Sequence, residues 1–81
     1  MRLKEMREDR DIKQITLAKY CNISQNTYSQ YENGVRQIPI EILIKLSFYY
    51  NTSVDYLLEL TDDSRRYPLS RKSTKQLSEK N

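Results

Sequence analysis

The sequence of 81 residues contains no histidine, one cysteine and one glycine. Without histidine, a cysteine pair or a glycine-rich phosphate loop, the usual acid–base, metal and nucleophile sites cannot be assembled. Asp62 and Asp63 form a carboxylate pair, but their polar surroundings favour a helix terminator over a metal site. The sequence therefore indicates a protein that is not an enzyme and that binds neither a metal nor a cofactor.

Long apolar runs are also missing. No stretch approaches the ~20 apolar residues of a membrane span, and no signal peptide opens the chain. The lone cysteine, Cys21, allows no disulfide within the chain and is expected to be a small buried residue. These absences predict a cytoplasmic protein without a membrane partner.

Few residues break helices, since the chain has one glycine and two prolines. Together with strong helical periodicity, this composition predicts one small all-α domain. Five helices are expected, at about residues 2–9, 14–21, 25–33, 39–50 and 54–60. The face that the fourth helix turns to the core is expected to carry Leu43, Leu46, Ser47 and Tyr50, and the fifth is expected to bury Val54, Leu57 and Leu58.

The third of these helices has an unusual surface. It opens on Ser24, a good N-cap, and stops at Asn33–Gly34. One face pairs Tyr28 with Tyr31, most simply as core residues and alternatively as rings that stack on bases. The other face is polar but uncharged, although 31% of the chain is charged, and it carries Gln25, Asn26, Ser29 and Gln30. Amides can bond bidentately to the N6/N7 edge of adenine in the major groove, so DNA reading competes with a merely amide-rich surface.

The preceding helix gives this surface a context. Residues 14–21 place Leu17, Ala18 and Cys21 on one face, and a break of three residues follows. Two short helices joined by such a turn, with a small residue where they cross, form a helix-turn-helix. Asn22 stands where the turn needs a positive φ, which asparagine tolerates best after glycine. Ile23 is expected to fill the corner between the helices.

The pattern across these helices resembles the Cro/cI (XRE) family of helix-turn-helix domains, which are lambda-repressor-like. It spans residues 14–39 in register and continues through Leu43, Leu46 and Ser47 to residues 51–58. The resemblance covers residues 1–61 and implies a compact five-helix domain. It further implies a sequence-specific transcriptional regulator, most simply a repressor, that binds double-stranded DNA. The reading helices of a homodimer would enter the major groove of a pseudo-palindromic operator.

The resemblance also assigns roles to particular side chains. Contacts to base edges are expected from the third helix, through Gln25, Asn26, Thr27, Ser29 and Gln30. Contacts to the DNA backbone are expected from residues around the two helix starts and the following loop: Lys13, Gln14, Ser24, Asn33 and Arg36. At the start of a helix, free N–H groups and the helix dipole favour an anion such as phosphate.

Arg7 is expected to have a structural role instead. It shares an apolar stripe with Leu3 and Met6, and a charge there needs a partner. The resemblance supplies Glu32, because the matching positions of the family form a buried ion pair. A DNA contact by Arg7 is the alternative.

Three features depart from the family pattern. Lys13 stands where a Ser or Thr cap is usual, so the second helix begins poorly capped or uses Asp11. Ile15 is apolar at a position that faces water. The fourth helix is apolar nearly all round, and such a patch usually marks an interface. A homodimer built on the fourth and fifth helices is therefore predicted, with contributions from Ile42, Tyr49 and Leu60, against the alternative of an apolar surface with no role.

The charge is unevenly distributed. Residues 1–60 hold eight basic and eight acidic side chains, whereas residues 61–81 hold six basic and three acidic ones. DNA binding by the neutral part must therefore depend on local placement of charge. Residues 62–81 are expected to be a disordered, basic polar tail that aids solubility, adds DNA affinity or exchanges between subunits. Two rival functions remain: an antitoxin whose main partner is another protein, and a protein-interaction module without DNA binding.

Overall fold

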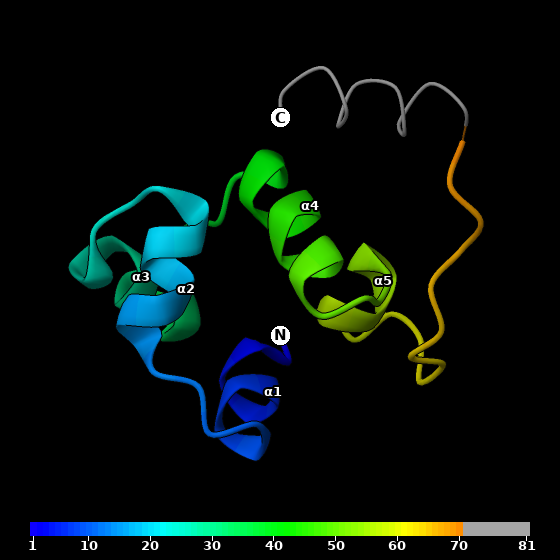
Figure 1. Ribbon diagram of the computed structural model, residues 1–81, viewed down its shortest axis with the longest axis horizontal. Coiled ribbons are helices and arrows are strands. Elements are labelled where there is room, and N and C mark those ends of the chain that lie inside the picture. Colours follow the sequence, from blue (N-terminus) through cyan, green and yellow to red (C-terminus); the bar gives the residue numbers. More distant parts are fainter. Residues whose placement is uncertain (71–81) are drawn as a thin grey trace.

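The computed structural model describes residues 1–70, and the rest of the predicted flexible tail, residues 71–81, lies outside the described residues. The described chain is all-helical: α1 (Leu3–Asp9), α2 (Gln14–Cys21), α3 (Gln25–Glu32), α4 (Ile40–Tyr49) and α5 (Val54–Leu57). Helices α2 and α3 lie on one side of α4, and α5 lies on its other side (Figure 1). This architecture confirms the predicted five-helix, all-α fold. Within residues 1–70, no helix has the length and apolar character that crossing a membrane would require.

The turn between α2 and α3 has the predicted geometry. Asn22 adopts a left-handed conformation (φ 59°, ψ 44°), and the next amide, of Ile23, donates to the carbonyl of Ala18 at 3.0 Å. Ser24 then caps α3, because its side chain accepts a hydrogen bond from the amide of Thr27. At the other end of α3, Gly34 has φ 73°, a value that suits glycine.

One apolar core joins all five helices. Leu17 and Ala18 of α2 are fully buried, as are Leu46 of α4 and Leu57 of α5. Tyr28 and Tyr31 point into the same core, with exposed fractions of 0% and 8%, so their rings are not available to stack on bases. The core-facing residues predicted for α2 and α4 are all buried, as predicted.

Helix α5 is shorter than predicted, because it ends at Leu57 and not at residue 60. Ser53 caps its start through the amide of Tyr56, as expected. Its end is set by Glu59, which has φ 64°, while the amide of Leu60 donates back to the carbonyl of Asp55. Leu60 therefore follows the helix and is 73% exposed.

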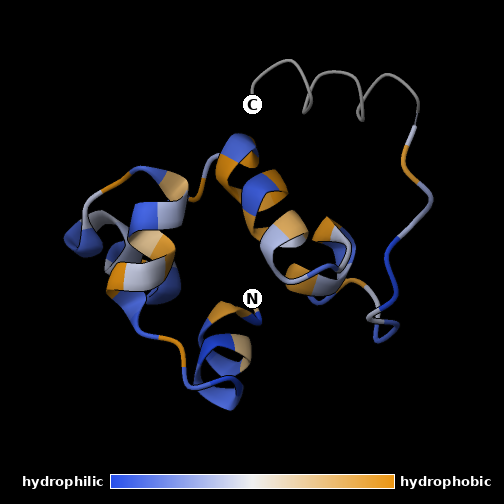
Figure 2. Cartoon of the chain, in the orientation of Figure 1, coloured by the Kyte–Doolittle hydropathy of each residue, from blue (hydrophilic) through white to orange (hydrophobic). Residues whose placement is uncertain are grey.

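Helix α4 carries more hydrophobic residues than α3, which is mainly hydrophilic (Figure 2). Ile44 is 40% exposed, and Ile15 on α2 is 37% exposed, as expected for that position. Ile42 was predicted to contribute to a dimer interface, but it belongs to the buried core and is 9% exposed, so it offers little surface to a dimer. Tyr49 is half-buried and packs edge-on against Tyr20, with ring centroids 4.9 Å apart.

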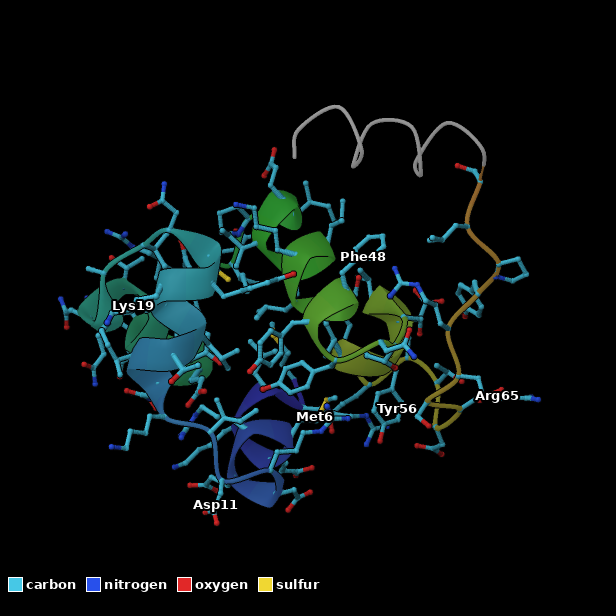
Figure 3. All side chains as sticks on the ribbon, in the orientation of Figure 1. Met6, Asp11, Lys19, Phe48, Tyr56 and Arg65 are labelled. Carbon is cyan, nitrogen blue, oxygen red and sulfur yellow. The ribbon has the colours of Figure 1, made fainter. Side chains whose placement is uncertain are left out.

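The chain beyond residue 61 stays against α4 and α5 over the part that the structure describes. The Arg66 guanidinium lies 3.8 Å from the ring centroid of Phe48 and donates to the carbonyls of Ser47 and Thr52. Phe48 faces this segment, whereas Arg65 extends away from the helices (Figure 3). A groove of about 480 Å³ remains between the segment and the two helices. The division of the chain at residue 61 stays a prediction.

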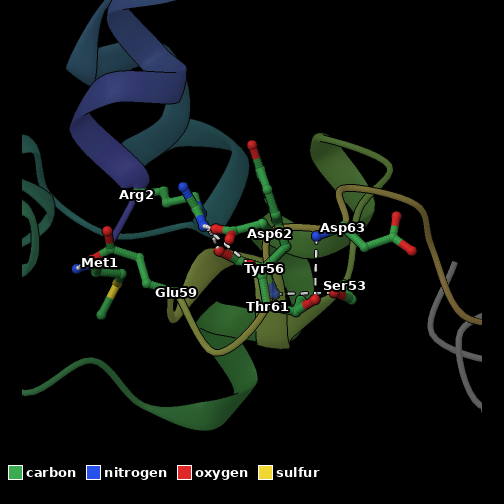
Figure 4. Close-up of polar contacts among 8 residues, drawn as sticks. All are labelled: Met1, Arg2, Ser53, Tyr56, Glu59, Thr61, Asp62 and Asp63. Atoms are coloured by element: carbon green, nitrogen blue, oxygen red, sulfur yellow. Dashed lines mark hydrogen bonds and ion pairs between the residues drawn. The ribbon is translucent and has the colours of Figure 1, made fainter.

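The N-terminus meets the end of α5 (Figure 4). The Met1 ammonium lies 2.7 Å from a carboxylate oxygen of Glu59. The Arg2 side chain donates to the carbonyls of Tyr56 and Thr61 and to the carboxylate of Asp62. Residues far apart in the sequence thus close the end of the shortest helix.

Candidate nucleic-acid interface

The outer face of α3 presents the three amide side chains that the sequence singled out. Gln25 and Asn26 are exposed, and Gln30 is half-buried. Within residues 1–70, none of these three side chains makes a hydrogen bond. Their carbonyl oxygens and amino groups are therefore free to bond to a ligand.

The hydroxyl groups on and next to α3, in contrast, already take part in hydrogen bonds within the protein. Ser24 Oγ accepts from the amide of Thr27 at 3.0 Å and donates to Thr27 Oγ1 at 2.9 Å. Ser29 Oγ accepts from Asn33 Nδ2 at 3.3 Å. These bonds stabilise the start and the end of α3, and they leave Ser24, Thr27, Ser29 and Asn33 with fewer groups to offer DNA than the amides have.

The start of α2 is open, as the sequence suggested. Lys13 occupies the N-cap position in an extended conformation, is exposed, and makes no side-chain cap. The alternative cap, Asp11, is not used, and this residue lies in the left-handed region with φ 57°. The first N–H groups of a helix have no intrahelical partner, so an uncapped start next to a lysine can receive an anion.

The loop after α3 carries the other predicted phosphate contact. Arg36 is exposed, and its backbone amide donates to the carbonyl of Gln30 at 3.3 Å. Val35 donates to the same carbonyl at 3.0 Å. The loop is thereby held against the end of α3, and the Arg36 side chain has no partner among the described residues.

A buried polar network lies behind this surface. Arg7 Nε donates to Glu32 Oε2 at 2.7 Å, and Gln14 Nε2 donates to Glu32 Oε1 at 3.1 Å. Arg7 Nη1 also donates to the carbonyl of Ile12 at 2.8 Å. The side chains of Glu32 and Arg7 are 0% and 13% exposed. Arg7 therefore forms the ion pair with Glu32 that the resemblance implied.

Both members of the pair are held in their charged forms. Burial alone would raise the pKa of Glu32, but hydrogen bonds from Arg7 and Gln14 outweigh it and lower that pKa below its usual range. The hydrogen bond to Glu32 raises the pKa of Arg7. Burial also raises the pKa of the neighbouring Tyr28 well above its usual range, so its hydroxyl stays protonated.

Gln14 has a second role that the sequence did not reveal. It was expected to contact phosphate, yet its amide bonds to Glu32 at the far end of α3. One donor of its NH₂ group is used, and the other remains. The bond links the first residue of α2 to the last of α3, 18 positions later, and no local signal marks such a pair.

Known protein sequences match most of this chain. A sequence model of the helix-turn-helix family matches residues 3–57. The uncharacterized HTH-type transcriptional regulator YobD of Bacillus subtilis (strain 168) is 34% identical over 79 residues, which are 98% of this chain and 70% of that protein. The HTH-type transcriptional regulator ImmR of the same organism is 40% identical over 65 residues, which are 80% of this chain and 51% of that protein. No solved structure matches significantly.

Proposed function

The chain belongs to the helix-turn-helix family, and on that premise we propose that it regulates transcription by reading a two-fold symmetric operator as a homodimer. The relatives are named as HTH-type transcriptional regulators, and together with the family match they support DNA-binding transcriptional regulation. The observation that carries the proposal is the outer face of α3, where three amide side chains have no partner within residues 1–70. The role is one of binding without catalysis, most simply repression, and is exerted in the cytoplasm.

Helix α3 is the reading helix in this proposal. The second helix of a helix-turn-helix lies in the major groove, with its N-terminal residues against base edges. Gln25 and Asn26 occupy that end of α3, and Gln30 follows one turn later. Thr27 and Ser29 make smaller contacts, because part of their hydrogen-bonding capacity is already used.

Backbone contacts fix the position of α3 on the duplex. The open start of α2, with Lys13 and the free donor of Gln14, faces one phosphate. Arg36 reaches another from the loop after α3, while Ser24 and Asn33 contribute at the two ends of the helix. Lysine and arginine contacts of this kind supply affinity without sequence preference.

The dimer is proposed to form through α4 and the chain that follows α5. Leu60 is 73% exposed and Ile44 is 40% exposed. Tyr49, which lies in α4 like Ile44, is half-buried. Two copies related by a two-fold axis would place their α3 helices in successive major grooves, with half-sites about 34 Å apart.

Oligomeric state tests the dimer directly. Sedimentation equilibrium at micromolar protein should give a dimer for the wild type and a larger monomer fraction for Leu60→Glu. Val35→Glu is the matched control, because Val35 is an equally exposed apolar residue (74%) in the loop after α3. A wild type that sediments as a clean monomer removes the dimer from the proposal.

Selection from random duplex DNA at about 150 mM salt tests DNA reading. The wild type should enrich a two-fold symmetric site, and Gln25→Ala/Gln30→Ala should lose that enrichment while keeping its melting temperature. Glu5→Ala, an exposed change on α1, should select the same site as the wild type. If the wild type enriches no sequence, the proposal fails, and the groove beside α4 becomes the place to search for a protein partner.

A further inference from the structure

Residues 64–70 follow α5 and run along the side of α4 that lies opposite α2 and α3 (Figure 1). The Arg66 guanidinium lies 3.8 Å from the ring centroid of Phe48 and donates to the carbonyls of Ser47 and Thr52, at 3.0 and 3.4 Å. A planar guanidinium is suited to both kinds of contact at once, because it stacks on an aromatic ring and directs N–H groups outward from its edge. The ring and the two carbonyls therefore form a binding site for an arginine side chain.

Two further contacts lie on either side of that arginine. The carbonyl of Ser64 accepts a hydrogen bond from Thr52 Oγ1 at 2.6 Å, and the Tyr67 hydroxyl donates to the carboxylate of Asp55 at 2.8 Å. Thr52 is 2% exposed, so its hydroxyl depends on this partner. All the groups that receive the segment in these contacts belong to residues 47–55, which we call the receiving surface.

The connection that leads to the segment is held separately. Arg2 donates to the carbonyl of Thr61 and to the carboxylate of Asp62. Asp63 follows, and its carboxylate pairs at the surface with Arg65, whose side chain is 87% exposed. A change of direction at this one position would carry the segment away from the receiving surface of its own chain, while Arg2 keeps its contacts.

The segment leaves apolar surface open when it binds to its own chain. The groove of about 480 Å³ between the segment and the two helices is lined in part by Ile44, Phe48, Val54 and Leu69. Ile44 is 40% exposed and Leu69 is 46% exposed. A second copy that approaches this side would cover such surface, and the burial would favour association.

The contacts of the segment are the same whether it belongs to the same chain or to a second copy, so an exchange retains all of them. The sequence alone left exchange as one of three roles for the tail and indicated no site for it. We infer that in the homodimer residues 64–70 of each copy bind to the receiving surface of the other, so that each arginine site is completed by Arg66 of the partner subunit. This inference rests on the dimer of the proposed function and specifies the contacts that hold the two copies together.

A mixture of two variants tests the exchange. Arg66→Ala breaks the segment and keeps the receiving surface, whereas Phe48→Ala breaks the receiving surface and keeps the segment. Neither variant alone has an intact arginine site, but a dimer of one copy of each has one such site if the segments are exchanged. Native mass spectrometry of an equimolar mixture, with one variant labelled with heavy nitrogen, should give an association constant of the mixed dimer about tenfold above its statistical value.

Labelled and unlabelled wild type are the control for this mixture and should form the mixed dimer in its statistical proportion. If the two variants also mix statistically, each copy keeps its own segment, and the inference is wrong.

A disulfide gives a second test that does not depend on the stability of Phe48→Ala. In a Cys21→Ala background, Thr52→Cys/Ser64→Cys places two thiols where the receiving surface meets the segment. After oxidation, exchange predicts a covalent dimer on a denaturing gel without reductant, and Cys21→Ala alone should run as a monomer. A disulfide within one chain, or no disulfide at all, would overturn the inference.

The outcomes separate the inference from the proposed function. If the wild type sediments as a dimer but the disulfide forms within one chain, the exchange is wrong and the proposed dimer stands. If the wild type sediments as a clean monomer, the exchange fails together with the dimer, and selection of a DNA sequence then tests the rest of the proposed function independently.

Discussion

The two halves of the domain are stabilised by different kinds of interaction. In the half that is proposed to read DNA (the reading half), α1, α2 and α3 meet at the buried pair of Arg7 and Glu32, to which Gln14 adds a hydrogen bond. In the other half, α4 and α5 share an apolar core, and two arginines close the helix ends from outside. Arg66 donates to one carbonyl in the last turn of α4 and to one after it, and Arg2 does the same at the end of α5.

This difference sets how each half responds to damage. A buried charge that loses its partner costs more free energy than a neutral, part-buried carbonyl that loses an arginine. The reading half therefore depends on matched partners, while the stability of the α4–α5 half is the sum of many smaller contacts. Single substitutions in the buried pair should therefore destabilise the whole fold more than single substitutions of Arg2 or Arg66.

Deletion of one member of the buried pair should have the largest effect. Arg7→Ala strands the Glu32 carboxylate in a site with 0% side-chain exposure, and the expected loss of unfolding free energy is about 3–5 kcal/mol. Urea unfolding followed by circular dichroism measures it.

The control replaces both charges by apolar side chains. Arg7→Met/Glu32→Leu should be much less destabilised than Arg7→Ala, because no uncompensated charge remains. A melting temperature unchanged in Arg7→Ala would show that the pair contributes nothing to stability.

Lowering the pH should destabilise the same pair less than Arg7→Ala does, because a protonated Glu32 is neutral and keeps part of its hydrogen bonding. The folded-state pKa of Glu32 lies below its ordinary value of 4.5. The pair therefore stabilises the fold above pH 4.5, and this contribution is lost as the pH falls through the lowered folded pKa. Over that acidic range the wild type should lose more stability than Glu32→Gln. Parallel losses in the two proteins would assign the acid sensitivity to other carboxylates.

The α4–α5 half should respond less to the loss of an arginine. Arg66→Ala removes the contact to Phe48 and the hydrogen bonds to two carbonyls, for an expected loss of about 1–2 kcal/mol. Arg65→Ala is the neighbouring control, since Arg65 pairs with Asp63 at the surface and is 87% exposed. Thermal unfolding should separate the two variants, and equal melting temperatures would show that Arg66 does not hold the segment.

The same contrast explains what the sequence could predict. The bounds of α2 and the start of α3 follow from local signals, since Asn22 and Ser24 act on residues within four positions of themselves. The end of α3 follows from Gly34 in the same way. Pattern and caps therefore located α2 and α3 almost to the residue.

Long-range pairings were missed for the opposite reason. Arg2 and Arg66 close helix ends through carbonyls 54 and 19 positions away, and neither residue looks different from any other surface arginine in the sequence. The end of α5 was misplaced because Glu59 takes a positive φ without being glycine or asparagine. Ile42 was assigned to an interface because the apolar pattern of α4 does not say which residues its neighbours cover.

The smallest effect should be a gain of stability in the reading half. Ser24 and Ser53 cap α3 and α5, but Lys13 leaves α2 uncapped in an extended conformation that a serine could use. Lys13→Ser should raise the unfolding free energy by about 0.5–1 kcal/mol, through a new cap and the removal of a cation from the positive end of the helix. Lys19→Ser, an exposed change in the last turn of α2, should bring no such gain. If Lys13 contacts phosphate, the same variant should bind DNA more weakly at every sequence and with a shallower salt dependence. A gain in stability with unchanged salt dependence would remove Lys13 from the DNA interface and leave the open start of α2 as a defect in capping alone.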